Sequence, residues 1–369
     1  MTTRRQFLQL TAGAIGVQAS GLSLAAIDAA VKPLEILVLG GTGFIGPHEI
    51  EYALARGHRV TMFNRGKRNA GMFGNRVEAL HGDRNADEGK GLKSLQGDRT
   101  WDVVIDNSGY VPRHVRDSAE LLKGRVGRYI FVSTLSVYDF EAGVFDFPED
   151  GPLAKLTDPT EEEVTNDSYG PLKAECDRIV REVYGDAATI IRPGYIVGPG
   201  DTSDRFTYWA VRVTRGGDVL APAGPDDEVQ WVDARDLCPW MVGLGERDIG
   251  GVFNVVGPAS PITNEGFLYG LRACTSAPVR FFWPRRELQE QFEITPPMLD
   301  TGGDSLHFGN ERSLEYGIEY RPLANTVMDT VAYWKSLPQE RRAKPRAGIA
   351  EDKEKEVIDR MRDLTKGQT

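Results

Sequence analysis

The feature that most constrains the fold of this chain is a glycine-rich segment, GGTGFIG, at residues 40–46. It follows a short apolar run at residues 34–39 and opens a segment with helical spacing that ends at Gly57. A strand, a glycine loop and a helix in this order are typical of a dinucleotide-binding unit, whose helix N-terminus faces the pyrophosphate. The predicted pyrophosphate-binding residues are Gly40, Gly43, Phe44, Ile45 and Gly46. No Lys-Ser/Thr pair follows, which excludes a Walker-type loop.

Short apolar runs then alternate with segments of helical spacing. Strands are predicted at 34–39, 59–63, 77–80, 101–106, 128–133 and 188–192, and helices at 45–56, 113–122 and 169–184. This alternation predicts an α/β fold, a Rossmann-type doubly wound parallel sheet with a smaller C-terminal substrate-binding lobe. We expect a dinucleotide-binding domain over 34–200, a mainly substrate-binding lobe over 201–340, and a charged tail or helix over 341–369.

The first 30 residues are interpreted as a targeting segment and excluded from the fold. Arg4 and Arg5 lie in TRRQFL, before an apolar stretch from Leu10 to Ile27 and a group of alanines. This pattern resembles a twin-arginine signal, which predicts export by the twin-arginine machinery to the periplasm or the extracellular space. The alternative, a transmembrane anchor, is disfavoured because the stretch is short and rich in small residues.

Composition limits the classes of partner. Apolar residues make up 40% of the chain and charged residues 27%, as in ordinary soluble proteins. The formal net charge of −10 argues against nucleic acid as the partner. Three cysteines cannot all pair and are expected to be free thiols. The five histidines show no metal-ligand spacing, so no metal site is expected.

The end of the second predicted strand bears on the choice of cofactor. NAD sites usually place an acid there to bind the ribose 2′-hydroxyl, whereas this chain has Asn64 and Arg65 followed by Lys67 and Arg68. A guanidinium suits a 2′-phosphate, so NADP(H) is favoured and NAD(H) is the alternative. A solvated basic turn is the other interpretation. Asp83, after the third strand, is predicted to bind the adenine amino group.

Tyr169 and Lys173 form a Y-x-x-x-K pattern on a predicted helix, where residues four apart share a face. An ammonium group near the phenol would lower its pKa, and the tyrosine could then serve as general acid or base. The lysine could also hold the nicotinamide ribose. The fifth strand ends in FVSTLSVY at residues 131–138, which brings hydroxyl groups to the carboxyl edge of the sheet.

These motifs, together with RPG at 192–194 and VGPG at 197–200, resemble the extended short-chain dehydrogenase/reductase superfamily, the NAD(P)-dependent epimerase/dehydratase group. The resemblance covers roughly residues 34–260 and implies Thr134, Tyr169 and Lys173 as the catalytic triad, with Ser133 and Ser136 ranked lower. Sugar-nucleotide dehydratases of this group carry Asp-Glu where this chain has Leu135-Ser136, which argues against 4,6-dehydration. The candidate substrate-binding residues are Arg205, Tyr208 and Arg212, with helix packing as their alternative role.

The function expected from the resemblance is hydride transfer between a bound NAD(P) and a hydroxyl or carbonyl of a sugar-like small molecule. Export would favour a tightly bound cofactor that is recycled internally, as in an epimerase. A catalytically idle dinucleotide-binding sensor or scaffold is one alternative. Another is a nucleic-acid-binding protein, because the front half also resembles chloroplast stem-loop-binding relatives. Members of the superfamily often dimerise through a four-helix face, so a homodimer is possible.

Overall fold

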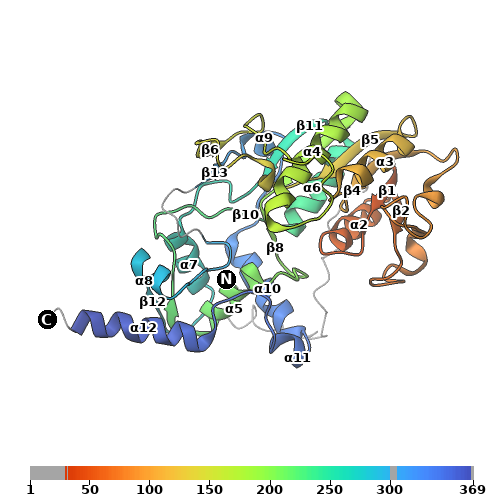
Figure 1. Cartoon of the computed structure of the whole chain (residues 1–369). Helices are drawn as coiled ribbons and strands as arrows, with labels where there is room; N and C mark the ends of the chain where they lie inside the picture. Colours follow the sequence, from red (N-terminus) through yellow and green to blue (C-terminus); the bar gives the residue numbers. More distant parts are fainter. Residues whose placement is uncertain (1–29, 31, 300–305, 367–369) are drawn as a thin grey trace, which may run out of the picture.

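The computed structural model describes Ala30, residues 32–299 and residues 306–366, so the expected signal segment lies almost entirely outside it. Within the described residues, the main sheet has seven parallel strands in the order β11-β7-β5-β4-β1-β2-β3 (Figure 1). They are β1 (Glu35–Leu39), β2 (Arg59–Asn64), β3 (Glu78–His81), β4 (Trp101–Asp106), β5 (Val126–Val132), β7 (Ala188–Pro193) and β11 (Gly251–Val255). The strand order reverses between β1 and β4, which is where a doubly wound sheet binds its ligand. The predicted fold class is confirmed.

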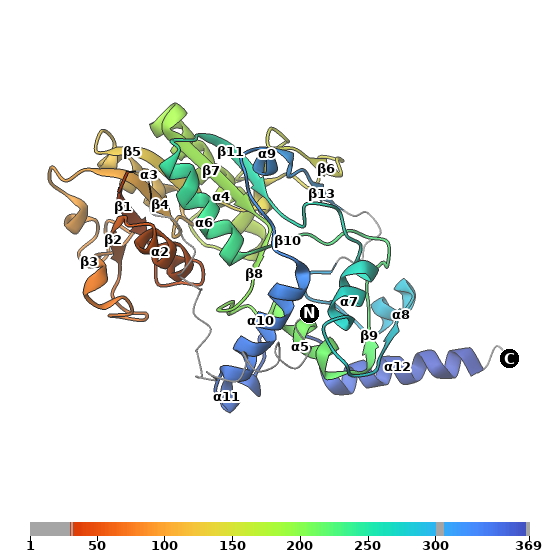
Figure 2. The same cartoon turned by 180° about the vertical axis from the view of Figure 1, so that it is seen from behind.

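Helices cover both faces of this sheet, as a parallel sheet requires. One face carries α2 (Gly46–Ala55) and α6 (Ala234–Glu246), which are in front in Figure 2, and the other carries α3 (Pro112–Leu122) and α4 (Asn166–Tyr184). Alternate residues of β1 pack on opposite faces: Ile36 and Val38 contact the first pair of helices, and Leu37 and Leu39 the second. The sheet is therefore apolar on both sides, which leaves the strand ends as the place for a polar binding site.

A smaller lobe extends from the carboxyl ends of these strands. Its elements are β8 (Tyr195–Val197), α5 (Arg205–Arg215), β9 (Gly217–Leu220), β10 (Trp231–Asp233), α7 (Asn264–Arg272), β12 (Val279–Phe282), α8 (Arg286–Gln291), α10 (Leu323–Ser336), α11 (Gln339–Arg342) and α12 (Glu351–Lys366). Strand β8 pairs with β10, and β9 pairs with β12. The core of the lobe is aromatic around Phe206, Trp209 and Phe267. The chain returns to the main sheet in α6 and β11, so the lobe is interleaved with the larger domain and is not one continuous segment.

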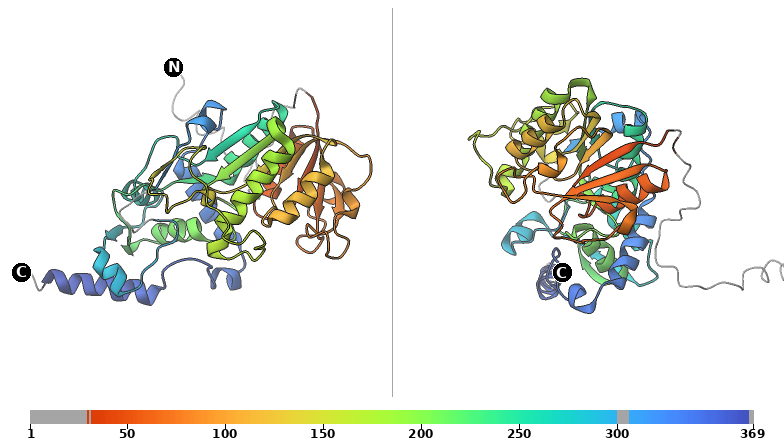
Figure 3. Two further views of the ribbon diagram at one scale, coloured as in Figure 1. Left: turned by 45° about the horizontal axis from the view of Figure 1, so that its top comes forward. Right: turned by 90° about the vertical axis from the view of Figure 1, so that its right-hand side faces the viewer.

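Two further segments connect the smaller lobe to the main sheet. Strand β6 (Asp146–Phe147) lies in the acidic connection before α4 and pairs with β13 (His307–Phe308), while α9 (Glu311–Glu315) lies against β11. The expected charged tail forms α12, which runs along the edge of the smaller lobe far from β1–β3 (Figure 3). Among the described residues, no helix has both the length and the apolar character needed to cross a bilayer.

Candidate active site

The glycine loop joins β1 to α2 and lines a cleft of about 700 Å³ at the switch point of the sheet. A Cβ at Gly46 would overlap the backbone of Gly41, so the helix packs directly on the loop. A Cβ at Gly43 would meet no protein atom, which means that the missing side chain there leaves space for a ligand. Ile45 is the N-cap of α2, and its side chain makes no capping hydrogen bond. The N-terminus of this helix faces the cleft, where its partial positive charge suits a pyrophosphate, and the cleft fits a dinucleotide.

The predicted adenosine-end residues Asn64, Arg65 and Asp83 all line the same cleft. Asn64 shapes its turn, because its Oδ1 accepts a hydrogen bond of 2.7 Å from the Gly66 amide. The Arg65 side chain is exposed and, within the described part of the chain, makes no hydrogen bond or ion pair. Lys67 also lines the cleft. The basic turn thus faces the space for the cofactor.

Gly41 and Arg84 also line this cleft and were not predicted from the sequence. The Gly-Gly pair at residues 40 and 41 was the available signal for Gly41. Arg84 forms a buried, two-pronged ion pair with Asp106, with nitrogen-to-oxygen distances of 2.5 and 3.0 Å, and Tyr129 donates to the same carboxylate at 2.7 Å. Burial disfavours charge on Asp106, but the guanidinium outweighs it and lowers the pKa of the carboxyl. Arg84 is thereby fixed at the wall of the cleft.

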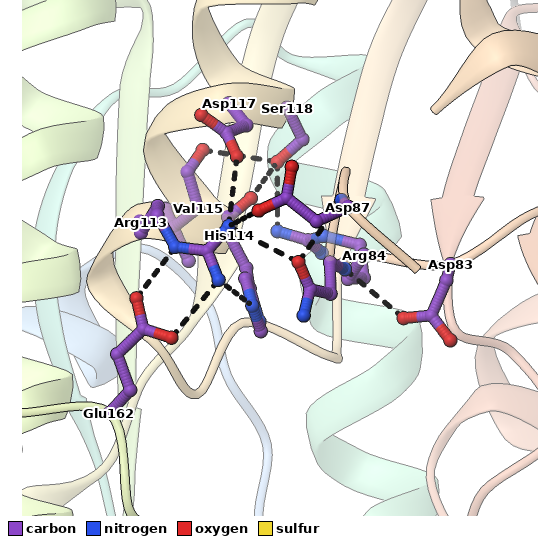
Figure 4. A network of polar contacts seen from close by, with 10 residues as sticks. Asp83, Arg84, Asp87, Arg113, His114, Val115, Asp117, Ser118 and Glu162 are labelled. Atoms are coloured by element: carbon purple, nitrogen blue, oxygen red, sulfur yellow. Dashed lines mark hydrogen bonds and ion pairs between the residues drawn. The ribbon is translucent and has the colours of Figure 1, made fainter. Parts of the chain in front are cut away.

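A second arginine, Arg113 at the start of α3, ties together the two loops that flank the cleft (Figure 4). Its guanidinium donates to both carboxylate oxygens of Glu162, at 2.6 and 3.0 Å, in the segment before α4. It also donates to Asn85 at 3.2 Å and to Asp87 at 3.1 Å, in the segment after β3. The neighbouring His114 lines the cleft. No local sequence pattern indicated this network, because its members come from three distant segments.

The three residues predicted as catalytic come together between the cleft and the smaller lobe. Thr165 and Ser168 form a capping box that starts α4 just before Tyr169. A Cβ at Gly170 would overlap the carbonyl oxygen of Ser136, so α4 packs directly on the 3₁₀ turn (Leu135–Val137) that follows β5. Thr134 lies beside Tyr169 at this point, with its hydroxyl donating to Ser136 at 3.3 Å.

The Lys173 ammonium group does not have the expected effect on the pKa of Tyr169. The buried Nζ donates to the carbonyls of Gly109 and Val132, both at 2.7 Å, and lies 4.1 Å from the centre of the Phe131 ring. Burial raises the pKa of Tyr169 above its ordinary value of 10, more than the neighbouring Thr134 hydroxyl lowers it. The expected lowering of the Tyr169 pKa is therefore not found in this structure, because burial of the phenol disfavours its charged form. Lys173 still lines the cleft, with one ammonium hydrogen left for a ligand.

A second cavity, of about 920 Å³, adjoins the cleft and lies between the two lobes. Phe44, Ser133, Tyr169 and Ile196 line both spaces, and Thr134 lines only the second. A substrate in this cavity would therefore meet the phenol of Tyr169 and a cofactor in the cleft at the same point. We refer to this space below as the substrate cavity.

Of the three candidate substrate-binding residues, the structure places only Arg205 in this cavity. Arg212 is 8% exposed and donates to Glu354 of α12 at 2.7 Å. Tyr208 packs against Gly348 and Trp209. The prediction for Tyr208 and Arg212 is corrected, because the C-terminal segment covers their side of α5. Tyr195, Asp201 and Glu228 line the cavity and were not predicted.

No group of three or more His, Cys, Asp or Glu side chains is arranged to hold a metal ion among the residues that the structure describes. All three cysteines are free thiols, and Cys176 and Cys238 are buried.

Comparisons with known proteins agree with this geometry. The sequence model of the NAD dependent epimerase/dehydratase family matches residues 36–256, more than half of the chain. A curated relative, chloroplast stem-loop binding protein of 41 kDa b of Arabidopsis thaliana, is 26% identical over 258 residues, which cover 66% of this chain. The chain spans only 63% of the length of that relative.

Two solved structures show the same fold. The enzyme WbmH of Bordetella bronchiseptica, in complex with NAD+, is 17% identical with a TM-score of 0.60, and the alignment covers 83% of this chain and 99% of WbmH. UDP-glucuronic acid 4-epimerase of Bacillus cereus, in complex with NAD, is 16% identical with a TM-score of 0.58, and the alignment covers 81% of this chain and 98% of the epimerase.

Proposed function

Because the chain belongs to the NAD dependent epimerase/dehydratase family, we propose that it is an NAD(P)-dependent oxidoreductase or epimerase. Its substrate in this proposal is a carbohydrate-like molecule that is oxidised at a hydroxyl-bearing carbon. The observation that carries the proposal is the position of Tyr169, which lines both the cofactor cleft and the substrate cavity, with Thr134 beside it in the cavity wall. A proton-transfer group at this junction is what coupled hydride and proton transfer requires.

In the proposed reaction, the Tyr169 oxygen takes the hydroxyl proton of the substrate while the adjacent carbon gives up its hydrogen as hydride. The Thr134 hydroxyl, in the wall of the same cavity, would hold the reacting oxygen beside the phenol. Lys173 would hold the nicotinamide ribose from the floor of the cleft. When bound, NAD(P) accepts and returns hydride. Return to the opposite face of the resulting ketone gives epimerisation, and return to a second substrate gives a paired oxidoreduction.

Tyr169→Phe tests this proposal, because it removes the phenol oxygen and keeps the ring. Loss of general acid–base catalysis is expected to lower kcat by about 10²–10⁴-fold while the affinity for the dinucleotide is retained. The matched control is Tyr269→Phe, on the exposed side of α7, which should keep full activity. Unchanged turnover in Tyr169→Phe would remove the proposed mechanism.

The pKa of Tyr169 adds a pH test. Burial raises this pKa above 10, so at neutral pH only a small fraction of the tyrosine is phenolate. Oxidation of a hydroxyl needs the phenolate and should speed up with rising pH through the neutral range, by up to about tenfold per unit. Reduction of a carbonyl needs the phenol and should hold its rate over the same range. A plateau of the oxidation rate below neutrality would contradict the assignment.

We propose in addition that NADP(H) is preferred, although the two structural neighbours described above are complexes with NAD. The support is the exposed Arg65 on the cleft wall, a position where a 2′-phosphate could receive a charge-assisted bond. Arg65→Asp should lower the NADP(H)-to-NAD(H) affinity ratio by about tenfold or more, whereas Lys90→Asp, outside the cleft, should leave it unchanged. A wild-type protein that binds NAD(H) more tightly would refute the preference.

We also propose export by the twin-arginine route with the cofactor already bound. The support is the Arg4-Arg5 pair and the apolar stretch that follows it in the sequence. Replacing both arginines with lysine should retain the protein in the cytoplasm, as measured by cell fractionation. Purified wild-type protein should carry a dinucleotide, which mass spectrometry of the released ligands detects. A homodimer stays a prediction.

Nucleic-acid binding is the second candidate, favoured by the similarity to a protein named for stem-loop binding. It predicts tight binding of an RNA stem-loop that weakens steeply with salt. The cations Arg65, Lys67 and Arg68 line the cofactor cleft in this chain, which favours the enzyme. Bound dinucleotide without turnover on any substrate would instead favour a sensor or scaffold.

A further inference from the structure

A buried carboxyl group follows the glycine loop closely. Glu49 lies in the first turn of α2, the helix whose N-terminus faces the cofactor cleft, and its side chain is fully buried. It takes no part in the mechanism proposed above. The positive end of this helix suits the pyrophosphate of the dinucleotide, which is itself an anion. A charged Glu49 would therefore compete with the ligand for the same helix end.

Glu49 is connected to the wall of the cleft through the side chain of Asn107. The Nδ2 of Asn107 donates a hydrogen bond to Oε1 of Glu49, and Asn107 itself lines the cleft just after β4. A Cβ at Gly40 would lie 3.4 Å from the Cβ of Asn107, so this side chain stands against the glycine loop. Glu49 thereby holds a residue that borders the space for the cofactor.

The surroundings of Glu49 favour its neutral form. Oε2 of Glu49 and Oδ1 of Asn107 are both buried and have no hydrogen-bond partner within the described part of the chain. Leaving a carboxylate in such a place is costly, whereas a protonated acid loses far less by burial. In agreement with this geometry, burial raises the pKa of Glu49 to about 8, against a smaller lowering by the hydrogen bond from Asn107.

The elements packed on this part of α2 bring no compensating charge to Glu49. The titratable group from α6 is the thiol of Cys238, and burial raises its pKa well above the ordinary value. Strand β2 contributes the apolar side chains of Val60 and Met62 to this core. On α2 itself, His48 contacts a backbone carbonyl at 3.1 Å, and burial lowers its pKa. The charge state of Glu49 is therefore free to respond to the ligand.

We propose that Glu49 is a positioning residue for the dinucleotide, which holds Asn107 against the glycine loop as a neutral acid and weakens cofactor binding when it ionises. Binding and protonation are then linked, so a dinucleotide that prefers the neutral form must take up a proton wherever Glu49 is ionised in the free protein. This inference rests on the proposed function for its cofactor site alone, and its test reads binding and not turnover.

The first measurement is calorimetric titration of the full-length wild-type protein with NADPH and with NADH, in buffers of different ionisation enthalpy. A group with a pKa of about 8 is half ionised at that pH, so binding at about pH 8 should take up about half a proton per dinucleotide. The Kd should rise by about five- to tenfold between about pH 7 and 9. Binding without proton uptake would overturn the proposal.

Glu49→Gln assigns the proton to this residue, because the amide keeps an oxygen for Asn107 and cannot ionise. Its Kd at about pH 7 should lie within about twofold of the wild-type value, with neither the proton uptake nor the rise in Kd at higher pH. The matched control is Glu51→Gln on the same helix, which removes a carboxylate paired with Arg76 at the surface and should behave as the wild type. Proton uptake retained in Glu49→Gln would overturn the proposal.

Glu49→Leu separates the hydrogen bond from the charge, because it keeps an apolar side chain in the buried site and releases Asn107. We expect its Kd at about pH 7 to rise by about three- to tenfold and to stay constant with pH. A wild-type Kd in Glu49→Leu would overturn the positioning role. Failure of the wild type to bind either dinucleotide at any pH would instead refute the proposed function, so the two failures are distinguishable.

Discussion

Replacing Gly170 with alanine tests whether the close approach of α4 to the end of β5 sets the catalytic geometry. A Cβ at this position would lie well inside 3.0 Å of the Ser136 carbonyl oxygen, a separation that real Cβ atoms do not show. Neither segment can shift easily, because Gly170 lies inside α4 and Ser136 lies in a 3₁₀ turn that Thr134 caps. The helix must therefore move away from the strand end, and it carries Tyr169 with it.

The expected losses of stability and of activity in Gly170→Ala can be estimated separately. Alanine in a helix gains about 1 kcal/mol over glycine, and overpacking costs about 1–3 kcal/mol, so the free energy of unfolding should fall by no more than about 2 kcal/mol. Separating the two groups requires a shift of about 1 Å, and a misplacement of that size costs about 10²-fold in rate. Activity should thus fall far more than stability.

The assay pairs steady-state kinetics of hydride transfer with urea unfolding of the same preparation. The matched control is Gly243→Ala in α6, another helical glycine, where an added Cβ would meet nothing within 4 Å. This control should keep full activity and gain about 0.5–1 kcal/mol in stability. Wild-type kcat in Gly170→Ala would refute the reasoning that this contact positions Tyr169 beside Thr134.

Three further predictions concern the cleft and the helix α2 that borders it. Gly43→Ala should raise the Kd for the dinucleotide by about tenfold or more in a binding titration, with an unchanged urea midpoint, because its Cβ would meet only the ligand; unchanged affinity would place the pyrophosphate elsewhere. Arg84→Met should lower the free energy of unfolding by about 3–5 kcal/mol by leaving the Asp106 carboxylate buried without its partner, and adding Asp106→Asn should restore part of the loss; a loss below about 1 kcal/mol would contradict the ion-pair argument. Burial raises the pKa of Glu49 to about 8, above its unfolded value, so its contribution to stability is full below the unfolded pKa and is lost as the pH rises toward 8. Between about pH 5 and 8, the free energy of unfolding of the wild type, measured with urea, should therefore fall relative to that of Glu49→Gln by up to about 1.4 kcal/mol per pH unit. Parallel pH profiles of the two proteins would show that Glu49 is ionised in the folded state.

The interactions around the cleft show what local sequence patterns leave out. Arg84 pairs with Asp106 and Arg113 pairs with Glu162, over separations of 22 and 49 residues. Each partner alone is an ordinary charged residue in the sequence, because a pairing across elements leaves no periodic signal. The same limit applies to Lys173: its helical position relative to Tyr169 was predictable, but the direction of its ammonium group depends on the carbonyls of Gly109 and Val132.

Helix α5 gives the clearest case of a pattern that was correct but incomplete. Arg205, Tyr208 and Arg212 follow helical spacing, which suggested one substrate-facing side. Spacing predicts which residues can share a face and does not say what covers that face. Here Glu354 and Gly348, from the far end of the chain, cover Arg212 and Tyr208, so that only Arg205 reaches the substrate cavity.

The sequence by itself determined the doubly wound α/β fold and the positions of its glycine loop and Tyr/Lys helix. Those features depend on short-range physics: apolar runs that suit buried strands, glycines that permit a close turn, and residues four apart on one helix. Only the tertiary structure decided that the two cavities meet at Tyr169, that Gly170 contacts Ser136 and that the pKa of Tyr169 rises. Each of these depends on burial and on contacts between distant segments, which exist only once the sheet has brought its strand ends together.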